Sequence, residues 1–354
     1  MSSANPVREA HVRWWPLVRY FLGVALGVVV LVVLFAQRGD LRSALHELDF
    51  VEPWWVVGAV GAESGSLLMF ALAQRWVLRA GGATIALPSL FAISLANNAI
   101  ANTVPGEPAV SSAFRYREYR RRGATGASSG WAILTVIVAQ AIGMSCVLLV
   151  GVIITIATST DASVTGAALV GVAVIIAAGV VLVRRDVLIG FMGHVVRGFQ
   201  RVTGHPRGDL AARVAAALER MRAIRLTPLA MFGLVALATM VWLLDLACLL
   251  CAFASVHASI PWHGVVLAYG VAQIVAVLPL VPGGLGLVEG GLTVVLVAYG
   301  STRVHALSTV LIYRAVSFWL AVVVGWASFG LLAVVARRTR RTNALRSSDG
   351  FDHG

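Results

Sequence analysis

The chain has 354 residues, of which 59% are hydrophobic and only 12% are charged, and its mean hydropathy is +0.86. A soluble domain is about 45–50% apolar and about 25% charged, so this composition excludes a soluble protein and predicts an integral membrane protein. The formal net charge is +12, and every basic residue is an arginine. A chain without lysine has no lysine nucleophile, no Schiff-base lysine and no P-loop.

The sequence offers no room and no signature for an enzyme. Its longest hydrophilic stretch, residues 184–227, is too short and too poor in core residues to form a separate catalytic domain. Cys248 and Cys251 have CxxC spacing, but no second ligand pair follows at the distance of a zinc site. Metalloprotease, nucleophile-elbow and dinucleotide motifs are missing as well. We therefore expect no metal, no cofactor and no catalytic activity.

Apolar runs of bilayer length predict six transmembrane helices. They cover residues 17–36, 54–74, 131–157, 164–183, 228–256 and 306–336. Two further apolar regions, 85–118 and 263–299, are each interrupted by Pro-Gly and predict re-entrant helical hairpins. The expected fold is an all-α polytopic membrane protein, with residues 17–336 in a single transmembrane domain.

The arginines predict which face is cytoplasmic. With the N-terminus inside and both hairpins re-entrant, 24 arginines fall on inside segments and 3 on outside segments, as the positive-inside rule requires. This places the N-terminal segment 1–16, a basic loop 184–227 and a tail 337–354 in the cytoplasm, and we expect the tail to be disordered. The loop fits either an amphipathic helix on the inner leaflet or a solvated connector. The basic excess then indicates contact with anionic inner-leaflet lipids and argues against binding to nucleic acid.

The two interrupted regions predict an internal repeat. Residues 54–157 and 228–336 each contain a span with one carboxylate, a Pro-Gly hairpin with a glycine 18 residues beyond its proline, and a second span. The chain reaches the first hairpin from the inside and the second from the outside, so the two copies have opposite orientations. Inverted repeats with discontinuous helices are typical of secondary transporters, whose substrate sites lie near the membrane midplane.

The interrupted helices also indicate where a substrate would bind. The N-terminal end of a half-helix at membrane depth favours an anion such as a lipid phosphate. Glu289 lies three residues after Gly286 and either holds the hairpin in shape or faces the substrate, and Arg314 either pairs with Glu289 or Asp245 or binds a phosphate bidentately. Glu63 and Asp245, which are costly to bury, are candidate coupling residues. The candidate substrate-binding residues are Pro105, Gly106, Glu107, Arg115, Pro282, Gly283, Gly284, Gly286, Glu289 and Arg314.

These motifs resemble a known family. The run from Pro282 to Gly290, followed by Ala298-Tyr299-Gly300 and Tyr313-Arg314, resembles the lysylphosphatidylglycerol synthase transmembrane region family, and the run from Asn98 to Gly123 resembles its first motif. The resemblance covers residues from about 54 to 336. It implies the lipid-translocating half of a two-part protein, located in a bacterial inner membrane, without the soluble domain that synthesises aminoacyl lipid. The first motif departs from the second because Pro108 follows Glu107 and no Gly-Gly-x-Gly is present.

We therefore expect a flippase that moves a phosphate-bearing lipid, of the phospholipid or polyprenyl-phosphate type, between leaflets. Two alternatives stay open. One is a membrane-embedded lipid-modifying transferase that uses histidines predicted to lie at the outer face, namely His257, His263 and His305. The other is a non-transporting partner of a lipid synthase.

Overall fold

The computed structural model describes residues 51–104, 107–158, 227–277 and 282–349, and within these ranges the protein is α-helical without β-strands. The helices are α3 (Pro53–Ala80), α4 (Leu87–Thr103), α5 (Glu107–Arg121), α6 (Gly126–Thr158), α10 (Pro228–Ser255), α11 (Val265–Val277), α12 (Leu287–Ala298), α13 (Arg303–Arg314) and α14 (Ala321–Asp349). A 3-10 turn, η2 (Pro282–Gly284), precedes α12, and a π-helical segment, η3 (Ala315–Leu320), joins α13 to α14.

Four helical segments in the described part are long and apolar enough to cross a bilayer. They are Pro53–Ala80, Gly126–Ala157, Pro228–Ser255 and the continuous helix Arg303–Arg337. The shortest have 28 residues, or roughly 42 Å at 1.5 Å per residue, which exceeds the hydrocarbon thickness of about 30 Å. Four of the six predicted spans therefore fall on suitable helices. The other two, 17–36 and 164–183, and the basic loop 184–227 lie outside the described residues.

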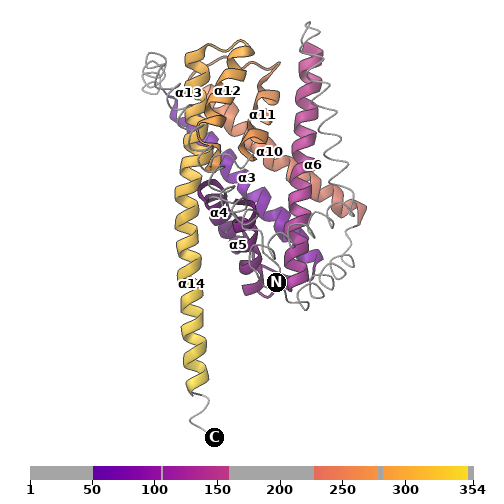
Figure 1. Cartoon of the computed structure of the whole chain (residues 1–354), viewed down its shortest axis with the longest axis vertical. Coiled ribbons are helices and arrows are strands. Elements are labelled where there is room, and N and C mark those ends of the chain that lie inside the picture. The colour runs from indigo at the N-terminus through magenta and orange to yellow at the C-terminus, as the bar shows by residue number, and fades with distance from the viewer. Residues whose placement is uncertain (1–50, 105–106, 159–226, 278–281, 350–354) are drawn as a thin grey trace, which may run out of the picture.

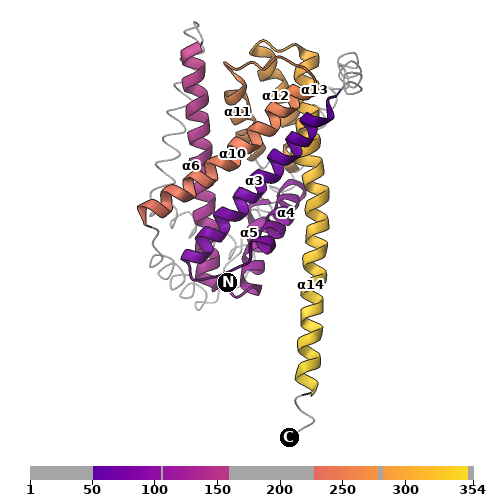
Figure 2. The ribbon, with the colours of Figure 1, turned by 180° about the vertical axis from the view of Figure 1, so that it is seen from behind.

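α3 and α10 pack side by side through the middle of the molecule (Figure 1, Figure 2). Ser66 Oγ of α3 donates a hydrogen bond of 3.0 Å to the Val241 carbonyl oxygen of α10. Eight residues earlier on α3, Gly58 faces Cys251, which lies ten residues later on α10. Because position along one helix rises as position along the other falls, the two helices are antiparallel. Small residues at this interface let the backbones approach closely, as is typical of helix pairs in membranes.

The two Pro-Gly regions form two helix pairs at opposite ends of the molecule. In Figures 1 and 2, α4 and α5 lie toward the lower end, where α3 ends and α6 begins. α11 and α12 lie toward the upper end, where α10 ends and α13 begins. Each pair thus starts and finishes toward one end of the molecule.

Both helix pairs finish in the same turn. Gly123 follows α5 with φ 91°, and Gly300 follows α12 with φ 92°, a left-handed conformation that glycine adopts without steric cost. In each turn the next N–H bonds to the carbonyl five residues back, which is the Schellman arrangement that ends many helices. These bonds join Ala124 to Tyr119 and Ser301 to Leu296, both at 3.1 Å.

The residue that starts the next helix is matched too. Thr125 Oγ1 accepts from the Ser128 N–H at 3.1 Å at the start of α6, and Thr302 Oγ1 accepts from the His305 N–H at 3.3 Å at the start of α13. A threonine side chain in this position satisfies one of the free N–H groups of a helix start. Two segments of unrelated composition therefore make the same helix–glycine–threonine–helix connection.

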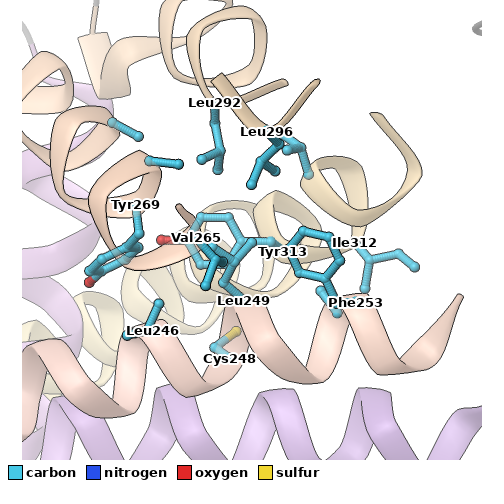
Figure 3. Packing of buried hydrophobic residues seen from close by; sticks show 14 of the residues in the cluster. Leu246, Cys248, Leu249, Phe253, Val265, Tyr269, Leu292, Leu296, Ile312 and Tyr313 are labelled. Atoms are coloured by element: carbon cyan, nitrogen blue, oxygen red, sulfur yellow. The ribbon is translucent and has the colours of Figure 1, made fainter. Parts of the chain in front are cut away.

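The core consists of two apolar clusters. One is built around α10–α13 and includes Leu249, Phe253, Leu292 and Leu296 (Figure 3). The other packs α3, α4 and α6 together around buried hydrophobic residues such as Val77 and Leu90.

The C-terminal helix differs from the prediction. α14 continues as helix to Asp349, so the expected disorder from residue 337 is wrong for 337–349. This stretch is rich in arginine, a strong helix former, and it contains no glycine or proline. Near its N-terminal end, α14 packs on α4 at Gly325, where an added Cβ would meet the Ala99 side chain at 2.6 Å.

Candidate functional site

The turn before α12 requires glycine at three positions. Gly283, Gly284 and Gly286 have φ values of 62°, 62° and 81°. An L-residue in this region is strained because its Cβ approaches the backbone. The Gly-Gly-Leu-Gly run is therefore a left-handed turn directly before α12.

Glu289 and Arg314 hold this turn together. Glu289 Oε2 accepts a hydrogen bond of 2.6 Å from the Gly286 N–H, and its Oε1 accepts one of 2.7 Å from Arg314 Nε. Arg314 Nη2 donates to the Gly283 carbonyl oxygen at 2.8 Å, and the guanidinium lies 4.3 Å from the ring centroid of Phe318. We call the contacts among Gly283, Gly286, Glu289 and Arg314 the turn lock.

The turn lock bears on the two predicted roles of Arg314. Only 7% of the residue is exposed, and two of its N–H groups already bind a carboxylate and a carbonyl. The pairing of Arg314 with Glu289 is thus present. A phosphate would have to use the remaining N–H groups of Arg314 or displace Glu289, so phosphate binding at Arg314 stays a prediction.

The turn before α12 contacts the end of α4 in the first helix pair. A Cβ added at Gly283 would lie 2.7 Å from the Asn102 carbonyl oxygen and would overlap the Phe318 ring. Asn102 Nδ2 donates to the Asn98 carbonyl at 3.0 Å and to Asn98 Oδ1 at 2.8 Å, so these amides stabilise the last turn of α4. Pro105 and Gly106 lie outside the described residues, as do the side chains of Glu107 and Pro282.

Arg115 of α5 is buried without a partner. Only 5% of the residue is exposed, and its Nε is buried with no hydrogen-bond acceptor. On α4, the other helix of this pair, the Oδ1 of Asn97 is also buried and has no hydrogen-bond partner among the described residues. Arg121 at the end of α5 and Arg122 in the turn after it behave differently, since each binds Glu118 at 2.5 Å. Among the described residues, Arg115 is therefore a buried cation that no carboxylate neutralises.

A polar network next to Arg115 connects three helices. Gln74 of α3 donates to Ser94 Oγ of α4 at 2.8 Å, and the hydroxyl of Tyr119 on α5 donates to Gln74 Oε1. All three side chains are buried. We did not predict this network from the sequence, although Tyr119 lies one helical turn beyond Arg115. It fixes the rotation of α5 and with it the direction of Arg115.

Glu63 and Asp245 face each other across α3 and α10. Gly65 lies against Leu244, with 3.3 Å between an added Cβ and Leu244 Cδ1, and this register places Glu63 opposite Asp245. The two carboxyl groups lie close enough to interact electrostatically with each other. The two candidate coupling residues, which we selected separately in the two copies, therefore form one site.

Asp245 also binds three donors from neighbouring helices. Its Oδ2 accepts from the Tyr269 hydroxyl at 2.7 Å and from Gln273 Nε2 at 2.5 Å, and its Oδ1 accepts from the Tyr313 hydroxyl at 3.0 Å. Figure 3 shows Tyr269 and Tyr313 on different helices above α10. Tyr269 and Gln273 were not predicted as site residues, although two polar residues four apart in an apolar helix mark one polar face.

A cavity of about 470 Å³ opens beside the C-terminal part of α3 and contacts α10. Its lining is mostly apolar but includes two arginines. The lining residues are Leu72, Arg75, Trp76, Arg79, Ala80 and Leu237. Nε of Arg75 is buried without a hydrogen-bond partner, and within the described ranges no carboxylate pairs with Arg75 or Arg79.

The three histidines make separate contacts. His257 has φ 54° in the turn after α10, and its Nε2 lies 3.1 Å from Glu52 Oε1. His263 packs edge-on against the ring of Tyr299, and His305 lies in the first turn of α13, where its N–H binds Thr302. No group of three metal-binding side chains occurs among the residues described.

Long apolar helices with ionisable groups held in their middle identify a helical membrane protein. The chain belongs to the family described as the lysylphosphatidylglycerol synthase TM region, whose model matches residues 20–325. The resemblance seen in the sequence is thereby confirmed. A UPF0104 membrane protein of Methanothermobacter thermautotrophicus is 28% identical over 330 residues, which cover 86% of this chain and 93% of that protein.

Proposed function

We propose that this protein moves an anionic, phosphate-bearing lipid between the two leaflets of a bacterial inner membrane, with both termini in the cytoplasm. The observation that carries this proposal is Arg115, a buried arginine without a carboxylate partner in the described part of the chain. A charged residue inside a membrane domain costs a few kcal/mol unless it is paired or faces a cavity, and such residues mark substrate pathways. An anionic substrate would supply the missing charge.

The chemistry of arginine favours phosphate as that anion. Its planar guanidinium presents N–H groups in a fork that matches phosphate oxygens, and it stays charged in an apolar environment. Asn97 lies on α4 of the same helix pair, and its amide N–H group would add a donor for a phosphate or for a polar headgroup. A lipid phosphate at Arg115 would keep its acyl chains in the surrounding bilayer.

The arrangement of the helix pairs supports transport. We propose six full spans and two re-entrant hairpins in an inverted repeat, in which the pairs α4–α5 and α11–α12 dip into the membrane from opposite faces. Their placement at opposite ends of the molecule and their matched glycine–threonine turns support this reading. In transporters of this architecture the substrate moves between repeats that rock around a site near the midplane.

The cavity beside α3 is the proposed entry point for the headgroup. Arg75 and Arg79 would attract an anionic headgroup, while Leu72, Trp76 and Leu237 would contact the lipid body. Tryptophan and arginine are typical of the interface between headgroups and hydrocarbon. A headgroup arriving here lies on the same helix as Gln74, whose network positions Arg115.

The test is lipid translocation in proteoliposomes that contain the full chain. We expect Arg115→Gln to lower translocation of an anionic phospholipid by at least about tenfold, equivalent to roughly 1.4 kcal/mol. Thermal stability should hold or rise, because the change removes a buried charge without breaking an ion pair. Arg117→Gln is the matched control, since Arg117 is an exposed arginine on the same helix. Equal translocation by the two variants would contradict the proposal.

We propose that the protein is not an enzyme. A lipid-modifying transferase would depend on its histidines, whereas we expect His257→Ala, His263→Ala and His305→Ala to translocate lipid normally. A non-transporting partner of a lipid synthase would show no translocation in proteoliposomes that contain this chain alone.

A further inference from the structure

The carboxyl pair Glu63–Asp245 has a definite arrangement of hydrogen-bond donors. Gln273 Nε2 donates to Asp245 Oδ2 at 2.5 Å and also to the hydroxyl oxygen of Tyr313 at 3.1 Å. Because Tyr313 accepts from Gln273, its own proton is free to point at Asp245 Oδ1, 3.0 Å away. With Tyr269 also donating, Asp245 receives three hydrogen bonds. An acceptor of this kind is an ionised carboxylate.

Glu63 has the opposite environment. Only 8% of the residue is exposed, and its Oε2 is buried without any partner. A buried carboxylate with an unsatisfied oxygen is strongly unfavourable, whereas a protonated acid loses less when its carbonyl oxygen is left bare. A proton held between these two carboxyl groups would relieve their mutual repulsion and supply the donor that two ionised carboxylates lack.

We propose that Glu63 and Asp245 form a proton-binding site, in which Glu63 carries the proton and donates it to the Asp245 carboxylate in this conformation. Release of that proton to water leaves two carboxylates facing each other across α3 and α10. The electrostatic repulsion between these two carboxylates would then act on the helices that carry them.

The groups around the site determine what that repulsion moves. Tyr269 and the uncharged Gln273 face it from α11, Tyr313 and Arg314 face it from α13, and Cys248 lies beside it on α10. Tyr313 is adjacent in sequence to Arg314, the cation of the turn lock. A shift of Asp245 or Tyr313 would therefore displace Arg314 from Glu289 and from the Gly283 carbonyl. Protonation of the Glu63–Asp245 site would therefore control the conformation of the turn before α12.

The proton-binding site stands on its own geometry, whereas its effect on lipid movement rests on the proposed function. Two measurements separate these claims. Infrared spectroscopy of the full chain in proteoliposomes detects the C=O stretch of a protonated carboxylic acid by its shift in D₂O. Translocation measured with and without an imposed pH gradient detects coupling to transport.

At neutral pH we expect a protonated-carboxyl band in the native protein, lost in Glu63→Gln and kept in Glu289→Gln. Glutamine in place of Glu63 still donates a hydrogen bond to Asp245, so this variant keeps the packing and loses only the exchangeable proton. Labelling all glutamates with ¹³C should shift the band, and labelling all aspartates should not, which tests the assignment without any substitution. A missing band, or a band that survives in Glu63→Gln, would overturn the proposal.

For transport, we expect the pH gradient to change the native rate several-fold and to leave the rate of Glu63→Gln unchanged. If the pH gradient also changes the translocation rate of Glu63→Gln, the proposed link between the proton and the turn before α12 is wrong. A native protein that shows the infrared band but translocates no lipid would retain the proton site and refute the proposed function.

Discussion

The two buried arginines in the described part of the chain, Arg115 of α5 and Arg314 of α13, have different environments, and the difference determines what each one does. Arg314 is held by a carboxylate, a carbonyl and an aromatic ring. Arg115 has none of these among the described residues. Arg314 is therefore available to stabilise the turn, and Arg115 is available to a ligand. In sequence, the first copy has no Gly-Gly-x-Gly run after its Pro-Gly, which agrees with unequal roles for the two hairpins.

Substitution of either member of the turn lock should destabilise the protein. Glu289→Gln or Arg314→Gln leaves a buried charge unpaired, at a cost of roughly 3 kcal/mol in the free energy of unfolding. The double variant Glu289→Gln with Arg314→Gln should recover most of that loss. Thermal unfolding in detergent measures this, with Arg117→Gln as a control. Equal stability of the single and double variants would show that the pair is not coupled.

At the scale of elements, the turn before α12 connects the second helix pair to the first, because Gly283 lies against the end of α4. Gly283 also lies against Phe318 in the π-helical segment. A π-helical segment widens the helix by one residue and often lies at a functional site. Here it begins directly after Arg314, so the same irregularity sets the directions of Arg314 and Phe318.

Gly283→Ala should therefore be harmful, and Gly291→Ala should not. At Gly283, alanine is strained by roughly 1–2 kcal/mol from its positive φ and also collides with the Asn102 carbonyl. At Gly291, within α12, a Cβ meets nothing within 4 Å, and alanine should stabilise the helix by up to about 1 kcal/mol. Thermal unfolding and translocation should both separate the two variants. A tolerated Gly283→Ala would contradict the proposed close contact of the two helix pairs.

At the scale of the whole molecule, the connections at its two ends face opposite sides of the membrane in our proposal. The α10–α11 connection carries the exposed Trp262, and α5 carries the exposed Arg117. Arg117 belongs to an arginine-rich segment, which the positive-inside rule assigns to the cytoplasm.

Single cysteines test this topology once Cys146, Cys248 and Cys251 have been replaced. A membrane-impermeant maleimide added to intact cells should label Trp262→Cys. The same reagent should label Arg117→Cys only after the membrane is permeabilised. Labelling of Arg117→Cys in intact cells would reverse the first hairpin and remove the inverted repeat.

The sequence by itself determined the features that depend on composition and local chemistry. Long apolar runs predicted helices α3, α6, α10 and α13–α14, because a helix satisfies its own backbone hydrogen bonds in a bilayer and needs about 20 apolar residues to cross it. The Pro-Gly and Gly-Gly-Leu-Gly runs predicted the break before α12, because proline and left-handed glycine end a helix locally. Charges inside apolar runs marked Glu63, Asp245 and Arg314 as residues that need partners.

Only the tertiary structure decided which partners those residues have. α10 is apolar on all faces, so periodicity does not indicate which side of the helix meets a neighbour, and the register with α3 follows from packing at Gly58 and Gly65. That register brings Glu63 to Asp245 across 182 positions of sequence, and the fold brings Tyr269 and Gln273 to the same carboxylate. Whether a buried charge is neutralised is a property of every helix around it, which is why the sequence marked Arg115 and Arg314 alike and the structure separated them.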